Sequence, residues 1–318
     1  MTYLLDFIIF FILFYSGYWM YVIIHSFFYD KKKKIKTKII RILFLLILLI
    51  IFGTIFYGSF IEPQLIIKRN YDINLNKTEQ TEHIKAIFLT DIHVGRFKND
   101  IFVQRVVNIV KKENPDIILL GGDYLLDKEK HAIDLHPLSQ LAETIPTFAV
   151  LGNHEYNQAN YNDPGYDDRT KLIKQLFKDW NINLLINQNK TITINNSELS
   201  ILGIDDLYTL TDDLNQAKKN IDNDIPKILL SHNPNIIAYD NFSEIDLTLS
   251  GHTHAGQIRL PIIGSVPNIP TSLGRKFDYG LFNLKQKGQL LISAGLGESG
   301  TRARLFNNPE ITIIDLDL

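Results

Sequence analysis

Two histidines, His252 and His254, stand two positions apart in the stretch DLTLSGHTHAGQIRLP (246–261), directly after an apolar run that is typical of a buried strand. An imidazole is costly to bury, and it serves mainly in hydrogen bonding, proton transfer or metal binding. In an extended segment both rings would lie on one face, as two ligands of a metal centre would. Taken alone, such a pair usually reflects packing at the end of a strand.

Four other apolar runs end in the same kinds of residue. These are Asp91 and His93 in FLTDIHVG, Asp123 in LLGGDY, Asn153, His154 and Glu155 in VLGNHEY, and His232 in LLSHNP. Five of the nine histidines of the chain lie at these run ends, and the other four have no such context. Because ligands bind at the carboxyl ends of strands in an open α/β sheet, the five run ends predict one shared site.

The residue types of this site indicate a divalent metal. Aspartate, asparagine and histidine without cysteine suit Mn, Fe, Zn or Mg. The absence of cysteine also excludes disulfides, thiolate ligands and a cysteine nucleophile. His154 directly follows Asn153, so we expect it to act as general acid toward a leaving oxygen. The alternative is an imidazole that only orients Asn153 or a phosphate, and Glu155 is expected to support His154 or a ligand.

The elements that must position these residues are alternating strands and helices. Strands are predicted within 83–91, 115–123, 146–153, 227–234, 246–254, 289–297 and 310–318, helices at 99–114, 135–145 and 170–180, and a hairpin at 191–204. We expect Asn99 or Asp100 to cap the first helix and Asn195–Asn196 to form the hairpin turn. The glycines of the motifs, Gly121, Gly122, Gly152 and Gly251, are expected to let the backbone turn sharply. This alternation is typical of an α/β sandwich with largely buried sheets.

The amino-terminal part has a different composition. Residues 7–24 and 42–61 are free of charged side chains, and each run is long enough to cross a membrane as a helix. The bases Lys31–Lys34, Lys36, Lys38 and Arg41 lie between them and predict a cytoplasmic loop, which places everything after residue 62 on the outer side. We therefore predict a two-helix transmembrane anchor at 1–62, a polar linker at 63–82 and a catalytic domain at 83–318.

Charge and one further motif exclude two other classes of protein. Residues 1–62 contain three acids and seven bases, which leaves 32 acids and 26 bases in the rest of the chain. That excess of acids argues against a nucleic-acid-binding face. The stretch GLGESG (295–300) fits a dinucleotide-binding pattern, but such a site also needs an opening helix and an acid about 20 residues later. TRARLFNNPE follows instead and the sequence runs only to 318, so we reject that interpretation.

The motifs D-x-H, G-D, G-N-H-E, H and G-H-x-H, in this order, resemble those of the calcineurin-like metallophosphoesterases over residues 83–318. The ending GLGESGTRARLFNNPEITIIDL, together with the amino-terminal spans, resembles a bacterial branch of membrane-associated phosphohydrolases, among them enzymes that cleave UDP-2,3-diacylglucosamine. The resemblance implies a four-layer α/β/β/α metallophosphoesterase sandwich, preceded here by two transmembrane helices.

The resemblance also implies a division of ligands between two divalent ions. Asp91, His93 and His254 would bind one ion, Asn153, His232 and His252 the other, and Asp123 both. Two such ions lower the pKa of a bridging water and hold phosphoryl oxygens. The recurrent tail motif favours a place near the substrate for Arg304. The alternative is that Arg302 and Arg304 merely pair with acids such as Glu310.

The sequence thus predicts a binuclear metal-dependent phosphohydrolase of the bacterial cytoplasmic membrane, with its catalytic domain on the extracytoplasmic side. Its substrate would be a phosphoester or pyrophosphate, carried by a phospholipid or a nucleotide-linked lipid. Nucleotide-linked lipids are cytoplasmic, so an outward domain favours an envelope phospholipid or polyprenyl phosphate. The alternatives are a phosphoprotein phosphatase and a non-catalytic metal-binding membrane platform. The complete ligand set and His154 argue against the platform.

Overall fold

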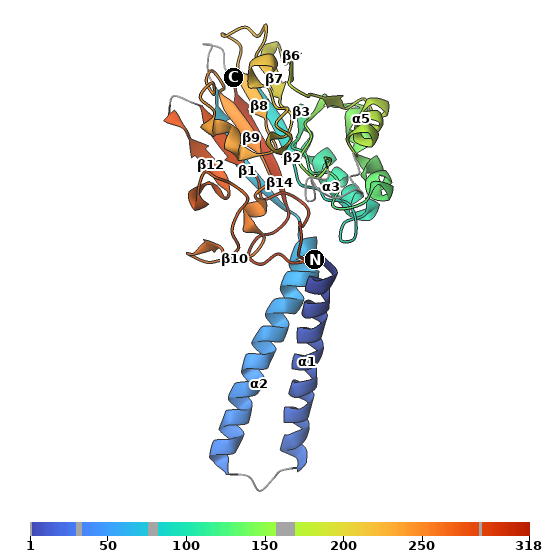
Figure 1. Ribbon diagram of the computed structural model, residues 1–318, viewed down its shortest axis with the longest axis vertical. Helices are drawn as coiled ribbons and strands as arrows, with labels where there is room; N and C mark the ends of the chain where they lie inside the picture. Colours follow the sequence, from blue (N-terminus) through green and yellow to red (C-terminus); the bar gives the residue numbers. More distant parts are fainter. Residues whose placement is uncertain (1, 30–33, 76–81, 157–168, 286–287) are drawn as a thin grey trace.

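The computed structural model (Figure 1) describes residues 2–29, 34–75, 82–156, 169–285 and 288–318. Two long helices, α1 (Thr2–Tyr29) and α2 (Ile35–Phe56), pack side by side and project from the rest of the molecule. A π-helical turn, η1 (Tyr57–Ile61), and a 3-10 turn, η2 (Glu62–Gln64), continue α2 toward the domain.

Both long helices are apolar and mostly exposed, and both are long enough to cross a membrane by length and composition. The predicted spans, 7–24 and 42–61, lie within the two helical segments Leu4–Tyr29 and Ile35–Gln64. Of the basic residues predicted to lie in the loop, Lys31–Lys33 are outside the described residues.

The other described residues form two six-stranded sheets and a small hairpin. The first sheet has the order β1 (Ile67–Asn74), β14 (Glu310–Asp317), β2 (His83–Leu89), β3 (Ile117–Leu120), β4 (Thr147–Ala149) and β5 (Asn183–Leu184). The second has the order β12 (Gly280–Asn283), β13 (Gln289–Ile292), β9 (Leu247–Ser250), β8 (Lys227–Leu230), β7 (Ser197–Gly203) and β6 (Gln188–Ile194). Strands β2 to β5 are mutually parallel, and so are β13, β9, β8 and β7.

Three apolar cores hold these layers together. One core lies between the sheets and takes side chains from strands of both. A second lies between the first sheet and α3 (Asp100–Glu113), η3 (Glu129–Leu138), α4 (Ser139–Ala142) and α5 (Thr170–Asp179). The third packs η5 (Leu207–Thr209), α6 (Leu214–Ala217) and η6 (Pro234–Ala238) on the second sheet. Each central strand is therefore buried on both faces, which explains its continuous apolar sequence.

Local signals in the sequence account for several elements. The Asn99 side chain caps α3 by accepting the N–H of Phe102 at 3.3 Å, as predicted. The helix buries its valine-rich face and ends at Asn114, which is left-handed. The predicted hairpin is confirmed as β6 and β7, and both turn residues, Asn195 and Asn196, have the positive φ of a type I′ turn.

Two predictions about the elements need correction. The segment 63–82 is not simply a linker, since β1 lies within it and pairs along its full length with β14. This edge strand is largely exposed, so its polar sequence resembles that of a linker. The helix predicted at 135–145 is mainly the 3-10 helix η3 followed by one short turn, α4, with Pro137 inside the helical stretch. Residues 76–81 lie outside the described residues.

Candidate functional site

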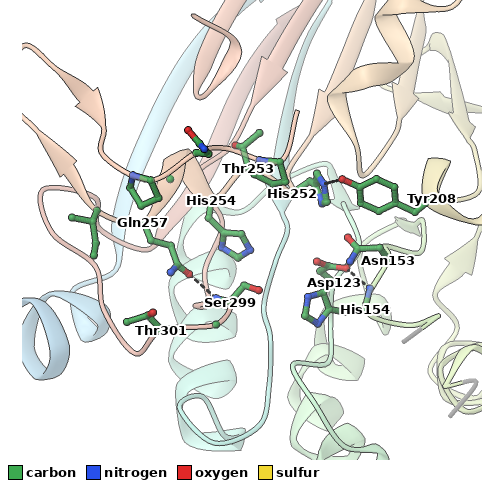
Figure 2. A pocket seen from close by; sticks show the side chains of 16 residues that line it. Asp123, Asn153, His154, Tyr208, His252, Thr253, His254, Gln257, Ser299 and Thr301 are labelled. Carbon is green, nitrogen blue, oxygen red and sulfur yellow. Dashed lines mark hydrogen bonds between the residues drawn. The ribbon is translucent and has the colours of Figure 1, made fainter. Parts of the chain in front are cut away.

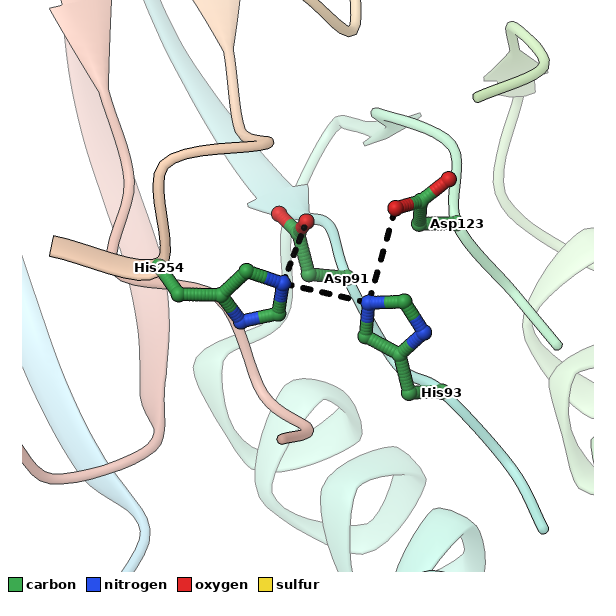
Figure 3. Close-up of side chains that lie close together, drawn as sticks. All are labelled: Asp91, His93, Asp123 and His254. Carbon is green, nitrogen blue, oxygen red and sulfur yellow. Dashed lines mark hydrogen bonds and ion pairs between the residues drawn. The ribbon is translucent and has the colours of Figure 1, made fainter. Parts of the chain in front are cut away.

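The predicted site residues meet where the two sheets present the carboxyl ends of their parallel strands. Each follows a strand and lies outside the strand itself. Asp91 and His93 follow β2, Asp123 follows β3, Asn153 and His154 follow β4, His232 follows β8, and His252 and His254 follow β9. Figures 2 and 3 show that residues far apart in sequence lie together here.

A first buried group consists of Asp91, His93, Asp123 and His254, whose ligand atoms all lie within 4.8 Å of one another (Figure 3). The Nε2 atoms of His93 and His254 are 3.1 Å apart. Nε2 of His93 lies 3.5 Å from Oδ2 of Asp123, and Nε2 of His254 lies 3.3 Å from Oδ1 of Asp91. The four side chains therefore converge on one point.

A second buried group consists of Asp123, His232 and His252. Nε2 of His232 is 3.2 Å from Oδ2 of Asp123 and 3.2 Å from Nδ1 of His252. Asp123 is common to both groups, so the two lie adjacent to each other. The sequence pair His252 and His254 is divided between them.

Hydrogen bonds on the far side of the rings set which nitrogen faces the centre. Nδ1 of His232 lies 2.8 Å from the carbonyl of Gly121, and Nδ1 of His254 lies 3.2 Å from the carbonyl of Gly297. A carbonyl only accepts, so each Nδ1 carries a proton and each Nε2 is the nitrogen that faces the centre. Nε2 of His252 contacts the Tyr208 hydroxyl at 3.2 Å, which leaves Nδ1 to face His232.

These donor sets fit divalent cations. Metal–ligand bonds of about 2.0–2.2 Å place neighbouring ligand atoms about 3 Å apart, close to the separations observed between the facing nitrogens and oxygens. Oδ1 of Asn153 is buried and has no hydrogen-bond partner within the described parts of the chain. A buried amide oxygen is rarely left unpaired, and such an oxygen is a suitable ligand.

The pKa shifts of the buried groups also indicate that the site requires positive charge. Burial lowers the pKa of His93 and of His252 to about 3, so both rings are neutral and can bind a metal. Burial raises the pKa of Asp91 to about 6. Burial also opposes a charge on His232, yet the carboxylates of Asp123 and Asp91 outweigh it and raise the pKa of this ring well above its usual value. The carboxylates thus retain a proton beside them, and a cation can take its place.

The backbone around the site is strained. Five residues of the two groups adopt positive φ angles: Asp91 53°, His93 49°, Asp123 55°, His252 67° and His254 50°. Such angles are uncommon outside glycine and cluster at functional sites. The strands that precede these residues are packed on both faces, and this packing holds the backbone in the strained conformation.

Two motif glycines serve for close approach rather than for the predicted sharp turn. A Cβ on Gly152 would lie 2.2 Å from Oδ1 of Asp123, and one on Gly251 would lie 2.1 Å from Oδ2 of Asp91. Of the four glycines predicted to allow a sharp turn, only Gly122 has a positive φ, of 91°. The carboxylates therefore occupy the space that a side chain would need.

His154 and Glu155 have different surroundings. The half-buried His154 ring contacts that of His93, and its Nδ1 lies 3.0 Å from the carbonyl of Leu126. Glu155 is buried and accepts backbone N–H groups from Asp123, Tyr124, Leu125 and Gly152 at 2.8 to 3.2 Å. Glu155 thus supports the loop that carries Asp123, as expected.

A cavity of about 600 Å³, the site cavity, opens over these residues (Figure 2). It is lined by Asp123, Asn153, His154, His252 and His254, and also by residues that sequence reasoning missed, including Tyr208, Gln257, Ser299 and Thr301. Tyr208 follows β7, whose apolar run ends in Asp205–Asp206. That ending resembles the other five and could have indicated this loop.

Arg304 does not occupy the predicted place beside a substrate. Its side chain has no exposed surface, and its two Nη atoms donate to five backbone carbonyls, those of Ala294, Gly295, Gly297, Asn307 and Asn308. Nε lies 3.4 Å from Glu298. Its neighbour Arg302 stacks on Phe60 and Phe97. This geometry supports a structural role for Arg304, in ordering the loop behind His254.

Comparison with known proteins agrees with this geometry. Residues 84–256 match the model of the calcineurin-like phosphoesterase family. The chain is 30% identical over 292 residues to an uncharacterized metallophosphoesterase of Campylobacter jejuni, covering 90% of this chain and 73% of that protein. It is 32% identical over 236 residues to the phosphodiesterase YaeI of Escherichia coli, covering 73% and 82%. It is 26% identical over 302 residues to the UDP-2,3-diacylglucosamine pyrophosphatase LpxG of Chlamydia muridarum, covering 81% and 91%.

Proposed function

Because this chain belongs to the calcineurin-like phosphoesterase family, we propose that it is a binuclear metal-dependent phosphohydrolase that cleaves a phosphoester or pyrophosphate of a lipid at a membrane surface. The chain is a metallophosphoesterase hydrolase with a candidate metal site. The observation that carries the binuclear assignment is the position of Asp123, whose carboxylate belongs to both buried groups beneath the site cavity.

In this proposal Asp91, His93 and His254 would hold one ion, and Asn153, His232 and His252 would hold the other. Asp123 would contribute to both. The adjacency of the two groups and the unpaired Oδ1 of Asn153 support this division. Two bound divalent ions, whether Mn, Fe, Zn or Mg, would lower the pKa of a water between them and neutralise phosphoryl oxygens.

We assign His154 the role of general acid. Its Nδ1 is engaged by the carbonyl of Leu126, so Nε2 is the nitrogen that remains for a leaving oxygen in the site cavity. The backbone N–H of His154 also donates to Oδ1 of Asp123 at 2.9 Å, which ties the acid to the shared carboxylate. Glu155 holds the Asp123 loop from behind. The hydrogen bonds of Asp123 and Glu155 therefore hold the proposed proton donor and the shared metal ligand in place together.

We further propose that α1 and α2 anchor the enzyme by crossing the membrane, and that the catalytic domain begins at β1 as a four-layer α/β/β/α sandwich. The bases Lys34, Lys36, Lys38 and Arg41 lie at the start of α2, at the end of the helix pair remote from the catalytic domain. Positive charge favours the cytoplasmic side, so the domain would lie on the extracytoplasmic side.

Two relatives bear on the substrate, and they differ. One is named a phosphodiesterase and another a pyrophosphatase of UDP-2,3-diacylglucosamine. An outward domain would meet envelope phospholipids or polyprenyl phosphates rather than nucleotide-linked lipids. We therefore place a lipid phosphoester of the outer leaflet first among the substrates.

The test uses the full chain in detergent with bis-p-nitrophenyl phosphate and Mn²⁺, Fe²⁺, Zn²⁺ or Mg²⁺. The parent should bind two ions per chain and hydrolyse the diester. Asp123→Asn should lose bound metal and turnover, and His154→Ala should keep the metal but lose about 10²–10⁴ in rate. A folded parent that binds two ions yet cleaves neither this diester nor lipid phosphates would instead be a metal-binding platform.

A further inference from the structure

Large apolar side chains are exposed on the face of the domain where α2 enters. They lie on the hairpin formed by β10 (Arg259–Leu260) and β11 (Gly264–Ser265), and on the loop before β14. Ile262 is fully exposed, Ile263 is 67% exposed and Phe306 is 61% exposed. We call Leu260, Ile262, Ile263, Val266 and Phe306 the apolar edge.

The turn of this hairpin is unusual for one in water. Turns normally carry Gly, Asn, Asp, Ser or Pro, and this one has Pro261 and Gly264 at its ends but Ile262 and Ile263 between them. Ile262 has a φ of 73°, a conformation that is rare and unfavourable for a β-branched residue. Neither the conformation nor exposure to water explains an isoleucine at this position.

Contacts through residues 304–306 connect the hairpin to α2 and to its continuation η1. The N–H of Arg304 donates to the carbonyl of Gly58 at 2.8 Å, and the N–H of Arg259 donates to the carbonyl of Leu305 at 2.9 Å. One hollow on the surface is lined by Gly53, Thr54, Tyr57, Leu305 and Phe306, and another is lined by Leu260, Pro261, Ile262 and Phe306 among others. The apolar surface of α2 therefore continues onto the hairpin, at the end of the domain from which the helices project (Figure 1).

The position of Phe306 along α2 gives the depth of this edge. The charge-free run 42–61 is 20 residues long, and at about 1.5 Å per residue it matches a hydrocarbon core of about 30 Å. Phe306 lies beside Gly53–Tyr57, four to eight residues before the end of that run. It would then lie about 6–12 Å from the domain-side end of the run, a range that overlaps the depth of about 5–10 Å that interfacial segments reach.

The same hairpin borders the site cavity. Gln257 and Ile258 precede β10, Pro267 and Asn268 follow β11, and all four line the cavity. A basic side chain lies behind the edge, since Arg275 donates to the carbonyl of Val266 at 3.2 Å. Apolar residues backed by a cation are typical of segments that lie in a bilayer interface.

We propose that the apolar edge enters the leaflet next to the catalytic domain, so that the site cavity opens at the bilayer surface and receives the phosphoester headgroup of a lipid whose chains stay in the membrane. This inference rests on the proposed membrane anchoring and phosphohydrolase activity. It adds a third membrane contact to the two helices. It also implies that the substrate is a lipid that reaches the site cavity from the bilayer.

The absence of native cysteine permits a direct test of depth in the full chain. Single cysteines at Ile262, Leu46 and Asn195 would carry an environment-sensitive fluorophore in vesicles of phosphatidylethanolamine and phosphatidylglycerol. Leu46 lies within α2, and Asn195 is an exposed residue in the β6–β7 turn, at the end of the domain away from the helices. Spin-labelled lipids should quench the labels at Ile262 and Leu46, and leave that at Asn195 unquenched.

The labels at Leu46 and Ile262 distinguish failure of the membrane anchor from failure of the apolar edge to enter the bilayer. Quenching at Leu46 without quenching at Ile262 would overturn the docking of the edge and leave the anchor intact. Absence of quenching at both would overturn the anchor itself, and the inference with it.

A matched pair of substrates tests the effect on catalysis. Hexadecyl p-nitrophenyl phosphate in vesicles and bis-p-nitrophenyl phosphate in solution share a leaving group but differ in the lipid chain. Ile262→Ser/Ile263→Ser should lower kcat/KM for the vesicle substrate by about tenfold or more, because two apolar contacts with the bilayer are lost. The rate on the soluble diester should remain that of the parent.

Ile133→Ser, at another exposed isoleucine remote in sequence from the edge, serves as the control and should leave both rates unchanged. Equal loss on both substrates, or no loss on either, would refute the inference. Failure of the parent on the soluble diester would instead count against the proposed function.

Discussion

Gly251→Ala should disable the site while leaving the fold in place. The added Cβ would lie 2.1 Å from Oδ2 of Asp91 and 2.3 Å from Oγ1 of Thr90. Neither neighbour can easily give way. Thr90 donates to Oδ2 of Asp91 at 2.8 Å, and both carboxylate oxygens accept the N–H of His252 at 3.1 Å.

The size of the effect follows from these distances. An ordinary carbon–oxygen contact exceeds 3.0 Å, so the carboxylate of Asp91 must move by about 1 Å, whereas a metal ligand tolerates about 0.2 Å. A displacement of about 1 Å at a reacting centre costs about 10²-fold in rate. The cost in stability from overpacking should be about 1–3 kcal/mol, which a folded domain can absorb.

The assay measures bound metal, kcat/KM on bis-p-nitrophenyl phosphate, and the thermal unfolding of the same preparations. The matched control is Gly17→Ala in α1, where an added Cβ meets nothing within 4 Å among the described residues. We expect Gly251→Ala to unfold cooperatively with one or both ions lost and turnover reduced about 10²-fold. Parental metal content and turnover in this variant would refute the packing argument.

Three further predictions concern residues around the site. Tyr208→Phe removes the hydroxyl that contacts Nε2 of His252 and should weaken metal affinity about 10- to 100-fold, as measured by titration with a competing chelator. Burial lowers the pKa of Lys98 from 10.5 to about 8 against the attraction of Glu298, so the unfolded chain binds more protons between these values, and the contribution of Lys98 to stability should rise by about 3 kcal/mol from pH 8 to pH 10.5. Melting curves in which the parent gains nothing over Lys98→Met across that range would contradict this. Arg304→Lys keeps a charge but cannot satisfy five carbonyls, so it should lower the free energy of unfolding by about 3 kcal/mol with an unchanged KM for the soluble diester. A raised KM with normal stability would restore the predicted substrate contact.

The sequence alone predicted the elements whose signals are local. The cap of α3 directly precedes the 14-residue helix that carries the valine face, and two asparagines specify the turn between β6 and β7. The site residues could also be predicted as a set, because each follows a buried apolar run and parallel strands align their carboxyl ends. Periodicity and strand polarity are properties of short segments, so no long-range information was needed.

Other features were decided only by the tertiary structure, because they depend on contacts between distant segments. It separates His252 from His254, it joins Tyr208 to His252 across 44 residues, and it buries Arg304, whose backbone N–H donates to the distant carbonyl of Gly58. It also makes β1 a strand, since an exposed edge needs only a partner for its backbone and no apolar sequence of its own. The role of the apolar hairpin beside α2 is likewise decided only by the tertiary structure. The two isoleucines of its turn can be interpreted only once the fold places them beside α2, which we propose to cross the membrane, because burial and proximity are set by the packing of the whole chain.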